Sequence, residues 1–369
     1  VYGVHGDGGL RYMIENLPQF LDSAGEFYLQ EGTGILFFRP EEGVDPNTLH
    51  LELTDKVGQI RIANQSHIQI GGLGFSFAHG NTIHMEDSVK DIRIHNCVFK
   101  DVPDIGVEAH MTLADEKRIA DGLEVADCSF ENIGTSGVDI SGERVWNDIA
   151  ERGELHEVNL LRNRTHYTGM RHRSSRWSNV SALSVARLRL GQIAGNIVEN
   201  SFGSGIVVLG GKEGALGPHA ARDAEIPHIR ILVHHNKTEN TALGVNDYGG
   251  LAIWQGGGIY TYNNIIGNSP GLMPAGFFGN TNSLSLSYPY YLDGAYKVYS
   301  FNNIIWGRSV DPEDRFANTT SGYFQVFGFL NQFTNNVIYR IKKAVGGSSG
   351  NRCDIVSNVF AEIPGEFFA

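Results

Sequence analysis

A short phrase recurs along the chain: alternating apolar residues, then an asparagine or aspartate, then one or two β-forming residues. The polar anchors of its copies stand at Asn96, Asp127, Asn163, Asn196, Asn236, Asn264, Asn303, Asn336 and Asn358. The shortest step, from 336 to 358, is 22 residues, and the longest, from 196 to 236, is 40. This repeat constrains the fold more than any other feature, because a unit of that length must bury its apolar face against its neighbours.

Alternation of period two on both sides of each anchor predicts strands, and a polar anchor between strands predicts a tight turn. If each repeat is one coil, stacked about 4.8 Å from the next, the asparagines of equivalent turns form a ladder of side-chain amides. The 46 glycines agree with a chain rich in turns and poor in helices. Propeller repeats share the period, but their blade phrases are missing. The sequence therefore predicts an all-β fold, a right-handed parallel β-helix of about ten coils.

The predicted β-helix occupies residues 59–369, and residues 1–58 differ from it. Segments 21–28 and 34–40 there predict two strands and a turn, which form an N-terminal cap or a flanking subdomain. The chain begins at Val1 without a signal peptide and ends just after a coil phrase. We expect a trimmed piece of a longer secreted protein, extracellular or periplasmic.

Charge and cysteine content exclude several classes of function. The formal net charge is −12, which argues against nucleic acid or an anionic membrane as the main partner. No apolar run approaches 18 residues, so no membrane-spanning segment is expected. Three cysteines are too few for a disulfide-rich scaffold. Cys97 and Cys128 occupy equivalent repeat positions and should stack as buried thiols, with a bridge between adjacent coils as the alternative.

A second short strand follows most anchors, and its polar residues predict a functional surface. If the apolar residues point inward, those between them point outward. The expected outward residues are His84, Glu108, Asp139, Val207, Ala252, Asp293 and Gln325, with Arg171 from an intervening coil. Stacked on one sheet, they would form a long, flat, polar groove that suits an extended, hydroxylated chain.

The densest signal is the pair Asp247 and Asp293, which lie on adjacent predicted coils. Two carboxylates about 5–9.5 Å apart, one protonated and one ionised, are the minimum for hydrolysis of a glycosidic bond. Trp254 beside them could stack on a sugar ring, and the glycines of 249–258 would let a substrate approach the backbone. The alternative is that Asp247 belongs to a turn and Asp293 is an exposed strand residue.

Other candidates have weaker support. Glu108, His110 and Asp139 could bind substrate or form a second acid/base pair, although solvated acidic side chains are the commoner explanation. Arg171 and His172 open the one basic cluster, with Arg173 and Arg176, which could bind a uronate or sulfate group or the protein's own acidic surface. No tight run of acidic ligands indicates calcium, so we expect neither a metal nor a cofactor.

The coil phrases, the segment from Asp22 to Pro40 and the contexts of Asp247 and Asp293 resemble the right-handed β-helix glycoside hydrolases. Glycoside hydrolase family 141, which includes α-L-fucosidase and xylanase activities, is the family it most resembles. The resemblance implies that Asp247 and Asp293 are the catalytic acid and the nucleophile or base, in either order. The resemblance also implies an upstream portion, which we expect to lie outside this chain.

The sequence thus predicts a secreted glycoside hydrolase that acts on a polysaccharide or oligosaccharide with an Asp/Asp pair. Trp254, Glu108, His110, Asp139, Arg171, His172 and Gln325 would bind the substrate. Two alternatives stay open. One is a polysaccharide lyase or epimerase that uses the basic cluster on a uronate. The other is a β-helix adhesin or structural component of an extracellular assembly, since the fold alone does not decide function.

Overall fold

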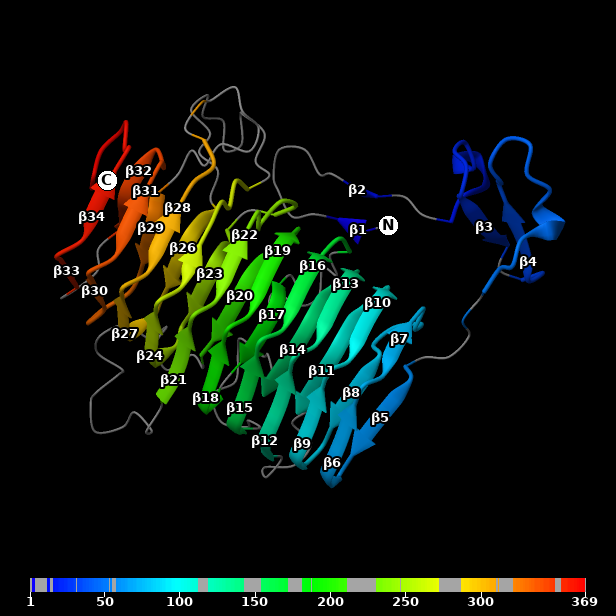
Figure 1. Cartoon of the computed structure of the whole chain (residues 1–369), viewed down its shortest axis with the longest axis horizontal. Helices are drawn as coiled ribbons and strands as arrows, with labels where there is room; N and C mark the ends of the chain where they lie inside the picture. Colours follow the sequence, from blue (N-terminus) through cyan, green and yellow to red (C-terminus); the bar gives the residue numbers. More distant parts are fainter. Residues whose placement is uncertain are drawn as a thin grey trace.

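The computed structural model describes residues 2–3, 12–13, 16–30, 32–52, 54, 58–111, 119–142, 154–171, 181–186, 188–210, 230–245, 247–271, 287–309, 311, 321–348 and 353–368. Three ten-stranded parallel sheets wind around one axis (Figure 1). Each strand pairs with the strand three places further along the chain, so that one coil contributes one strand to each sheet. This arrangement is the predicted right-handed parallel β-helix, with ten coils.

The strands of the three sheets are as follows. The first sheet contains β5 (Ile60–Ala63), β8 (Ile83–Glu86), β11 (Ile105–Met111), β14 (Ser136–Gly142), β17 (Ser181–Ala186), β20 (Ser204–Leu209), β23 (Gly249–Trp254), β26 (Tyr288–Asp293), β29 (Ser321–Val326) and β32 (Lys343–Ser348). The second contains β6 (Ser66–Gly71), β9 (Val89–His95), β12 (Ile119–Ala126), β15 (Glu154–Leu161), β18 (Leu188–Ala194), β21 (Arg230–His234), β24 (Gly257–Tyr262), β27 (Tyr296–Phe301), β30 (Gln332–Thr334) and β33 (Asp354–Val356). The third contains β7 (Gly74–Ser76), β10 (Val98–Val102), β13 (Ser129–Ile133), β16 (Arg164–Thr168), β19 (Ile197–Ser201), β22 (Lys237–Glu239), β25 (Ile265–Ile266), β28 (Ile304–Trp306), β31 (Val337–Tyr339) and β34 (Val359–Ala361).

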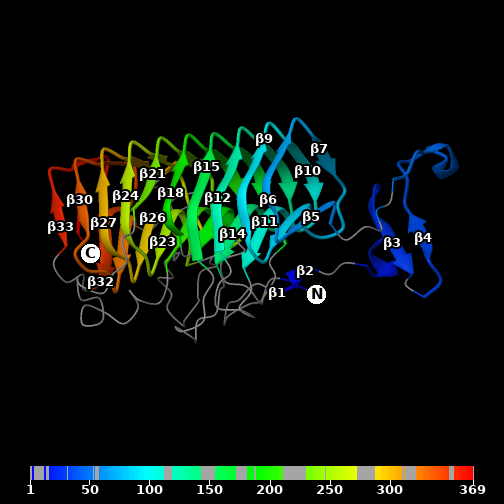
Figure 2. The same cartoon turned by 90° about the horizontal axis from the view of Figure 1, so that it is seen from below.

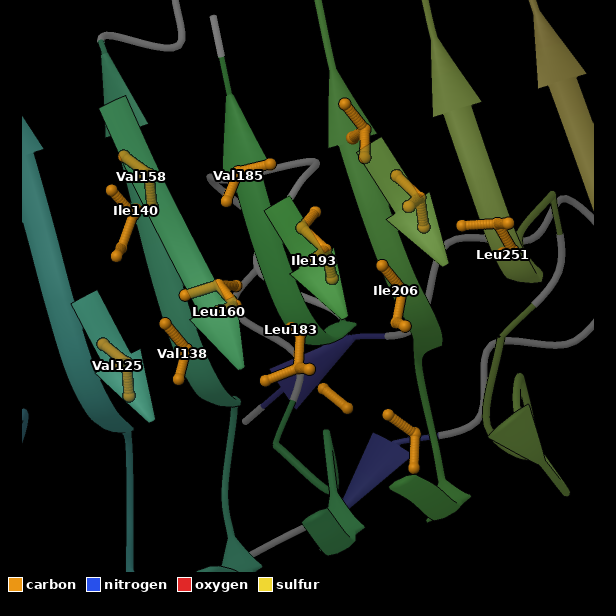
Figure 3. Packing of buried hydrophobic residues seen from close by; sticks show 14 of the residues in the cluster. Val125, Val138, Ile140, Val158, Leu160, Leu183, Val185, Ile193, Ile206 and Leu251 are labelled. Carbon is orange, nitrogen blue, oxygen red and sulfur yellow. The ribbon is translucent and has the colours of Figure 1, made fainter. Parts of the chain in front are cut away.

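The core is the inside of the coils, where every second side chain of a strand points. Figure 3 shows aliphatic side chains of successive coils packed in this interior, such as Ile140, Val185 and Leu251. Phe75, Phe99 and Phe130 stack along the axis, with neighbouring ring centroids 4.9 and 4.7 Å apart. Because equivalent residues of neighbouring coils lie in register, one apolar position per repeat yields a continuous column through the core.

The predicted asparagine ladder is present at the turn before the third sheet. The Asn163 backbone N–H and side-chain amide both donate to Oδ1 of Asn196, at 2.9 and 3.1 Å. The same pattern of two donors continues through Asn196, Asn236, Asn264, Asn303, Asn336 and Asn358. These buried amides satisfy one another, which is the condition for polar groups inside a core.

The anchor alignment is wrong by one residue in the first two copies. Cys97 and Cys128, and not Asn96 and Asp127, hold the ladder positions: Cys97 N–H donates to Cys128 Sγ (3.5 Å), and Cys128 N–H donates to Asn163 Oδ1 (3.1 Å). Both cysteines are buried and free, which confirms the prediction that they stack as thiols without a disulfide bridge. Asn96 and Asp127 instead take the left-handed turn position just before the ladder, with φ of 51° and 56°.

The N-terminal region forms small sheets of its own. β1 (Tyr2–Gly3) pairs with β2 (Tyr12–Met13), and the antiparallel hairpin of β3 (Phe27–Gln30) and β4 (Ile35–Phe38) matches the two strands predicted there. Two 3₁₀ turns complete the regular elements within the described residues, η1 (Pro18–Phe20) and η2 (Pro46–Thr48). The hairpin stands apart from the coils in two perpendicular views (Figures 1 and 2), and Phe27 is 63% exposed. Its role as a cap or flanking subdomain stays a prediction.

Helices are nearly absent from the described residues, and none there has the length and apolar character needed to cross a bilayer.

Candidate functional site

The outward face of the first sheet carries the predicted acidic pair on two neighbouring strands. Trp254 at the end of β23 lies directly opposite Asp293 at the end of β26. Asp247 precedes β23 by two residues and has φ of 66°, a left-handed conformation that aspartate tolerates better than most residues. Asp247 and Asp293, 46 positions apart in the sequence, thus flank opposite ends of neighbouring strands, and both lie close to Tyr291 on the outer face.

Tyr291 links the two carboxylates. Its hydroxyl donates to Asp247 Oδ1 at 2.9 Å, and it lies close enough to Asp293 to lower the pKa of that carboxyl group. Burial, and then the negative charges of Asp247 and Asp293, raise the pKa of Tyr291, so its proton stays in place as a donor.

The two carboxyl groups differ in acidity. Burial and the neighbouring charge of Asp247 raise the pKa of Asp293 to about 6, while the hydrogen bond from Tyr291 opposes the shift. Burial also raises the pKa of Asp247, and Tyr291 again opposes it. Two carboxylates that share a desolvated site do not ionise together easily. Of the two carboxyl groups, Asp293 therefore keeps its proton up to the higher pH.

Aromatic rings surround the pair. Trp254 packs against Tyr248, with ring centroids 5.4 Å apart, and edge-on against Tyr291 at 6.5 Å. Tyr288 contacts Tyr291 at 5.3 Å and stacks on Phe324 at 4.0 Å. We call Asp247, Asp293, Tyr248, Trp254, Tyr288 and Tyr291 the aromatic–acidic site. It lies outside the coils, in a hydrophobic cluster separate from the main core.

Trp254 does not offer an open ring face. The residue is 4% exposed, so the expectation that it stacks on a sugar in this arrangement is not met. Its indole N–H is buried and has no acceptor among the described residues. An unpaired buried donor costs about 1–3 kcal/mol. What Trp254 presents to the site is therefore a hydrogen-bond donor that lacks a partner.

The glycines near the site serve the packing of the coils. A Cβ on Gly250 would lie 2.9 Å from Thr238 Oγ1, inside the coil, and one on Gly257 would overlap the Tyr296 ring. At these two positions the absent side chain serves packing, and the expectation that the glycines of 249–258 give a substrate access to the backbone stays a prediction.

The predicted outward column is correct at its start and wrong at its end. The strand register gives the outer column as Arg61, His84, Glu108, Asp139, Ser184, Val207, Ala252, Tyr291, Phe324 and Gly346. Asp293 points outward but stands two residues beyond this column. Gln325 points inward, because Tyr323 and Gln325 share the inner face, where the Tyr323 hydroxyl donates to Gln325 Oε1 at 2.8 Å. Gln325 therefore does not lie on the predicted groove.

The outer column is not an open groove either. Glu108, Asp139, Ser184, Val207, Ala252 and Tyr291 are each 3% exposed or less. From Ser184 onward the column consists of small, apolar and aromatic side chains, which favour burial.

Glu108 belongs to a second polar group, four strands from β23 along the sheet or about 19 Å at ~4.8 Å per strand. His84 Nδ1 lies 2.7 Å from Glu108 Oε2, and its Nε2 lies 3.2 Å from Glu86 Oε2. Asn81 donates to Glu108, and Arg61 pairs with Glu86. The bond with Glu108 is the main cause of a raised pKa at His84. We call Asn81, His84, Glu86 and Glu108 the His84–Glu108 cluster.

The remaining candidates are spread over the molecule. Asp139 follows Glu108 on the next strand of the outer column. The Arg171 backbone N–H donates to the Gly134 carbonyl at 2.6 Å, and Arg171 precedes β17, two strands from β23 along the sheet or about 10 Å at ~4.8 Å per strand. His110 is part of β11, but its side chain lies outside the described residues, as do His172, Arg173 and Arg176 altogether.

The three tyrosines of the site, Tyr248, Tyr288 and Tyr291, were not predicted. Tyr288, Tyr290 and Tyr291 form an aromatic run in which Tyr290 points inward and binds Thr261 at 2.7 Å. Strict alternation from a buried Tyr290 would have assigned Tyr291 to the outer face beside Asp247.

Across the described part of the chain, no three His, Cys, Asp or Glu side chains gather as a metal site would require.

Comparison with known proteins adds little. No family model and no curated protein matches the chain. One solved structure that resembles it is the A-module of mannuronan C-5 epimerase AlgE6 of Azotobacter vinelandii, with a TM-score of 0.36 and 12% identity over 84% of this chain and 79% of that chain. The resemblance to glycoside hydrolase family 141 has no support from these comparisons.

Proposed function

We propose that the chain is a carbohydrate-active enzyme that hydrolyses a glycosidic bond at the aromatic–acidic site. The observation that carries this is the pair of half-buried carboxyl groups, Asp247 and Asp293, joined by the Tyr291 hydroxyl and unequal in acidity. Glycoside hydrolysis needs one carboxylic acid and one carboxylate around the scissile bond.

The unequal pKa values assign the roles. Asp293, with a pKa near 6, is the general acid that gives its proton to the leaving oxygen, since an acid works best when its pKa is near the operating pH. Asp247 remains the carboxylate, held by the Tyr291 hydroxyl, and acts as the nucleophile or as the base for a water molecule. Tyr291 is a positioning residue that fixes the Asp247 oxygen.

The charge of the site favours hydrolysis over uronate chemistry. A uronate would bring a third carboxylate beside Asp247 and Asp293, and among the described residues no lysine, arginine or histidine pairs with either aspartate to offset it. Like charges in a desolvated site are unfavourable. A secreted location is part of this proposal, because a polysaccharide substrate does not enter cells intact.

The test is product analysis on a panel of neutral and acidic plant and algal polysaccharides. New reducing ends, lost by more than ~10²-fold in both Asp247→Asn and Asp293→Asn, are the expected result. The rate should fall above about pH 6, where Asp293 loses its proton. An unsaturated product that absorbs in the ultraviolet, or inversion at C5, would identify a lyase or an epimerase instead.

A further inference from the structure

Among the residues that the structure describes, no basic side chain forms an ion pair with the two carboxylates of the aromatic–acidic site. Burial and the Tyr291 hydroxyl act on the pKa of both aspartates, and the charge of Asp247 acts in addition on that of Asp293. No ion pair joins Asp247 or Asp293 to a basic side chain within the described residues. A site with two carboxylates and no cation attracts a positive ligand, and desolvation strengthens that attraction.

The rings around the carboxylates suit the same ligand. Tyr248, Trp254 and Tyr291 form two contacts, at 5.4 and 6.5 Å between centroids, and the second is nearly perpendicular at 81°. Aromatic faces attract ammonium groups within about 6 Å, most strongly where water is excluded. Aromatic rings and carboxylates together are the usual surroundings of a bound organic cation.

The Trp254 N–H, which has no acceptor among the described residues, is an independent indication of a ligand-binding site. Trp254 is only 4% exposed, and its indole nitrogen finds no acceptor among the described residues. A cation alone would leave this donor unpaired. A ligand that carries both a positive charge and oxygen acceptors satisfies the carboxylates and the indole together.

The His84–Glu108 cluster shows how the same sheet treats acidic residues that serve structure. There the chain supplies the counter-charges: His84 lies between Glu108 and Glu86, and Arg61 pairs with Glu86. At the aromatic–acidic site the chain supplies a phenol and an indole. Within the described part of the chain, the aromatic–acidic site therefore differs from the His84–Glu108 cluster in having carboxylates without a basic partner.

We propose that the aromatic–acidic site binds a sugar that carries a protonated amino group, so that the substrate is a saccharide containing free amino sugars. The ammonium lies against Asp247, Asp293 and the tyrosine rings, and a hydroxyl or ring oxygen of the same sugar accepts the Trp254 N–H. This identification rests on the proposed function for its chemistry, but the binding itself does not require turnover.

Binding can be measured without catalysis. The chain has four tryptophans, so protein labelled with 5-fluorotryptophan gives few ¹⁹F signals, and Trp254→Phe assigns the one at the site. The probes are the methyl glycosides of glucosamine, glucose, N-acetylglucosamine and glucuronic acid, titrated at pH 6.5 in 0.15 M salt. We expect the Trp254 signal to shift with glucosamine at a concentration at least ~10-fold lower than with the other three, which is the factor that 1.4 kcal/mol of charge pairing provides.

Two variants separate specific binding from attraction to an acidic protein. Asp247→Asn/Asp293→Asn should abolish the preference for glucosamine. Glu131→Gln/Glu362→Gln makes the same change of charge at half-exposed surface sites and should keep it. Equal shifts for glucosamine and glucose, or equal loss of preference in both double variants, would overturn the proposal.

The outcomes also separate this inference from the proposed function. Cleavage of neutral oligosaccharides that depends on Asp293, without any preference for amines in binding, would overturn the inference and leave the hydrolase. Binding of glucosamine at Trp254 without hydrolysis of any saccharide, glucosamine oligomers included, would support the inference and overturn the hydrolase.

Discussion

The two ends of the outer column use carboxylates in opposite ways. At the His84–Glu108 cluster, buried Glu108 is matched by His84 at 2.7 Å and by Asn81. At the aromatic–acidic site, the partner of Asp247 is the neutral Tyr291 hydroxyl, and the surroundings are rings. Both groups stand on the same sheet, in the same repeating backbone. The difference lies in the side chains alone.

This comparison separates stability from function. A buried carboxylate that is paired and hydrogen-bonded contributes to the folded state, and removing one partner exposes the other to an unfavourable environment. A carboxylate whose pKa is raised by burial weakens the folded state when it ionises. Natural proteins keep such groups where the chemistry requires them.

The largest expected contrast comes from neutralising one carboxylate at each end. Glu108→Gln should lower the free energy of unfolding by about 1–3 kcal/mol, since it breaks a buried, charge-assisted hydrogen bond, and it should retain most activity. Asp293→Asn should abolish activity while the free energy of unfolding stays equal or rises. Urea unfolding at pH 7 and the hydrolysis assay measure both. A stable, inactive Glu108→Gln protein would reverse the assignment of the two ends.

The pH dependence of stability should separate the two ends next. Asp293 has a folded-state pKa of about 6 against an ordinary 3.8, so the folded state binds its proton more tightly and stability falls as pH rises from about 4 to 6. His84 also has a raised pKa, so the stability it contributes is complete below its ordinary 6.5 and is lost as pH rises above that value.

Thermal unfolding at constant salt from pH 4 to 9 would test this order. Asp293→Asn should remove the fall in stability between about pH 4 and 6, and His84→Gln should remove the fall above pH 6.5. If either substitution removes the other step, the two groups are not independent.

The smallest expected effect is at Ser184, which stands between the two ends in the outer column. Its hydroxyl is buried and finds no partner among the described residues. Ser184→Ala should raise the free energy of unfolding by up to about 1 kcal/mol, because it removes a desolvated polar group. Val207→Ala, one coil further, is the matched control and should destabilise by the usual cost of a core cavity. A loss of stability in Ser184→Ala would mean that its hydroxyl is satisfied.

The sequence predicts the architecture well because the repeat is written into every coil. Period-two alternation and recurrent asparagines gave the coils, their number and the ladder. The register of the ladder was missed at Cys97 and Cys128, where thiols replace the amides and the preceding Asn96 and Asp127 resemble ladder residues. Local sequence does not distinguish the two adjacent turn positions when both are polar.

The site was predicted in part for a related reason. Asp247 and Asp293 were found because stacking places neighbouring coils side by side, although the two residues do not hold equivalent positions, since Asp293 pairs with Trp254. Gln325 was assigned to the outer face, an error of one residue. Tyr291 was overlooked because Tyr290 and Tyr291 follow each other in β26, and their sequence alone does not show which of them points outward. Burial of Glu108 and Trp254 depends on what covers the outer face, which the repeat does not encode.

The asparagine ladder also sets a rule for how such a molecule changes length. Every amide in it faces the same way, with its oxygen toward the preceding coil and its nitrogen toward the following one. The steps between consecutive ladder asparagines vary from 22 to 40 residues without breaking the ladder. Residues can therefore be inserted or deleted between ladder asparagines, and whole coils can be added or removed. Deletion of a single ladder asparagine instead leaves an unpaired donor on the preceding coil and an unpaired acceptor on the following coil.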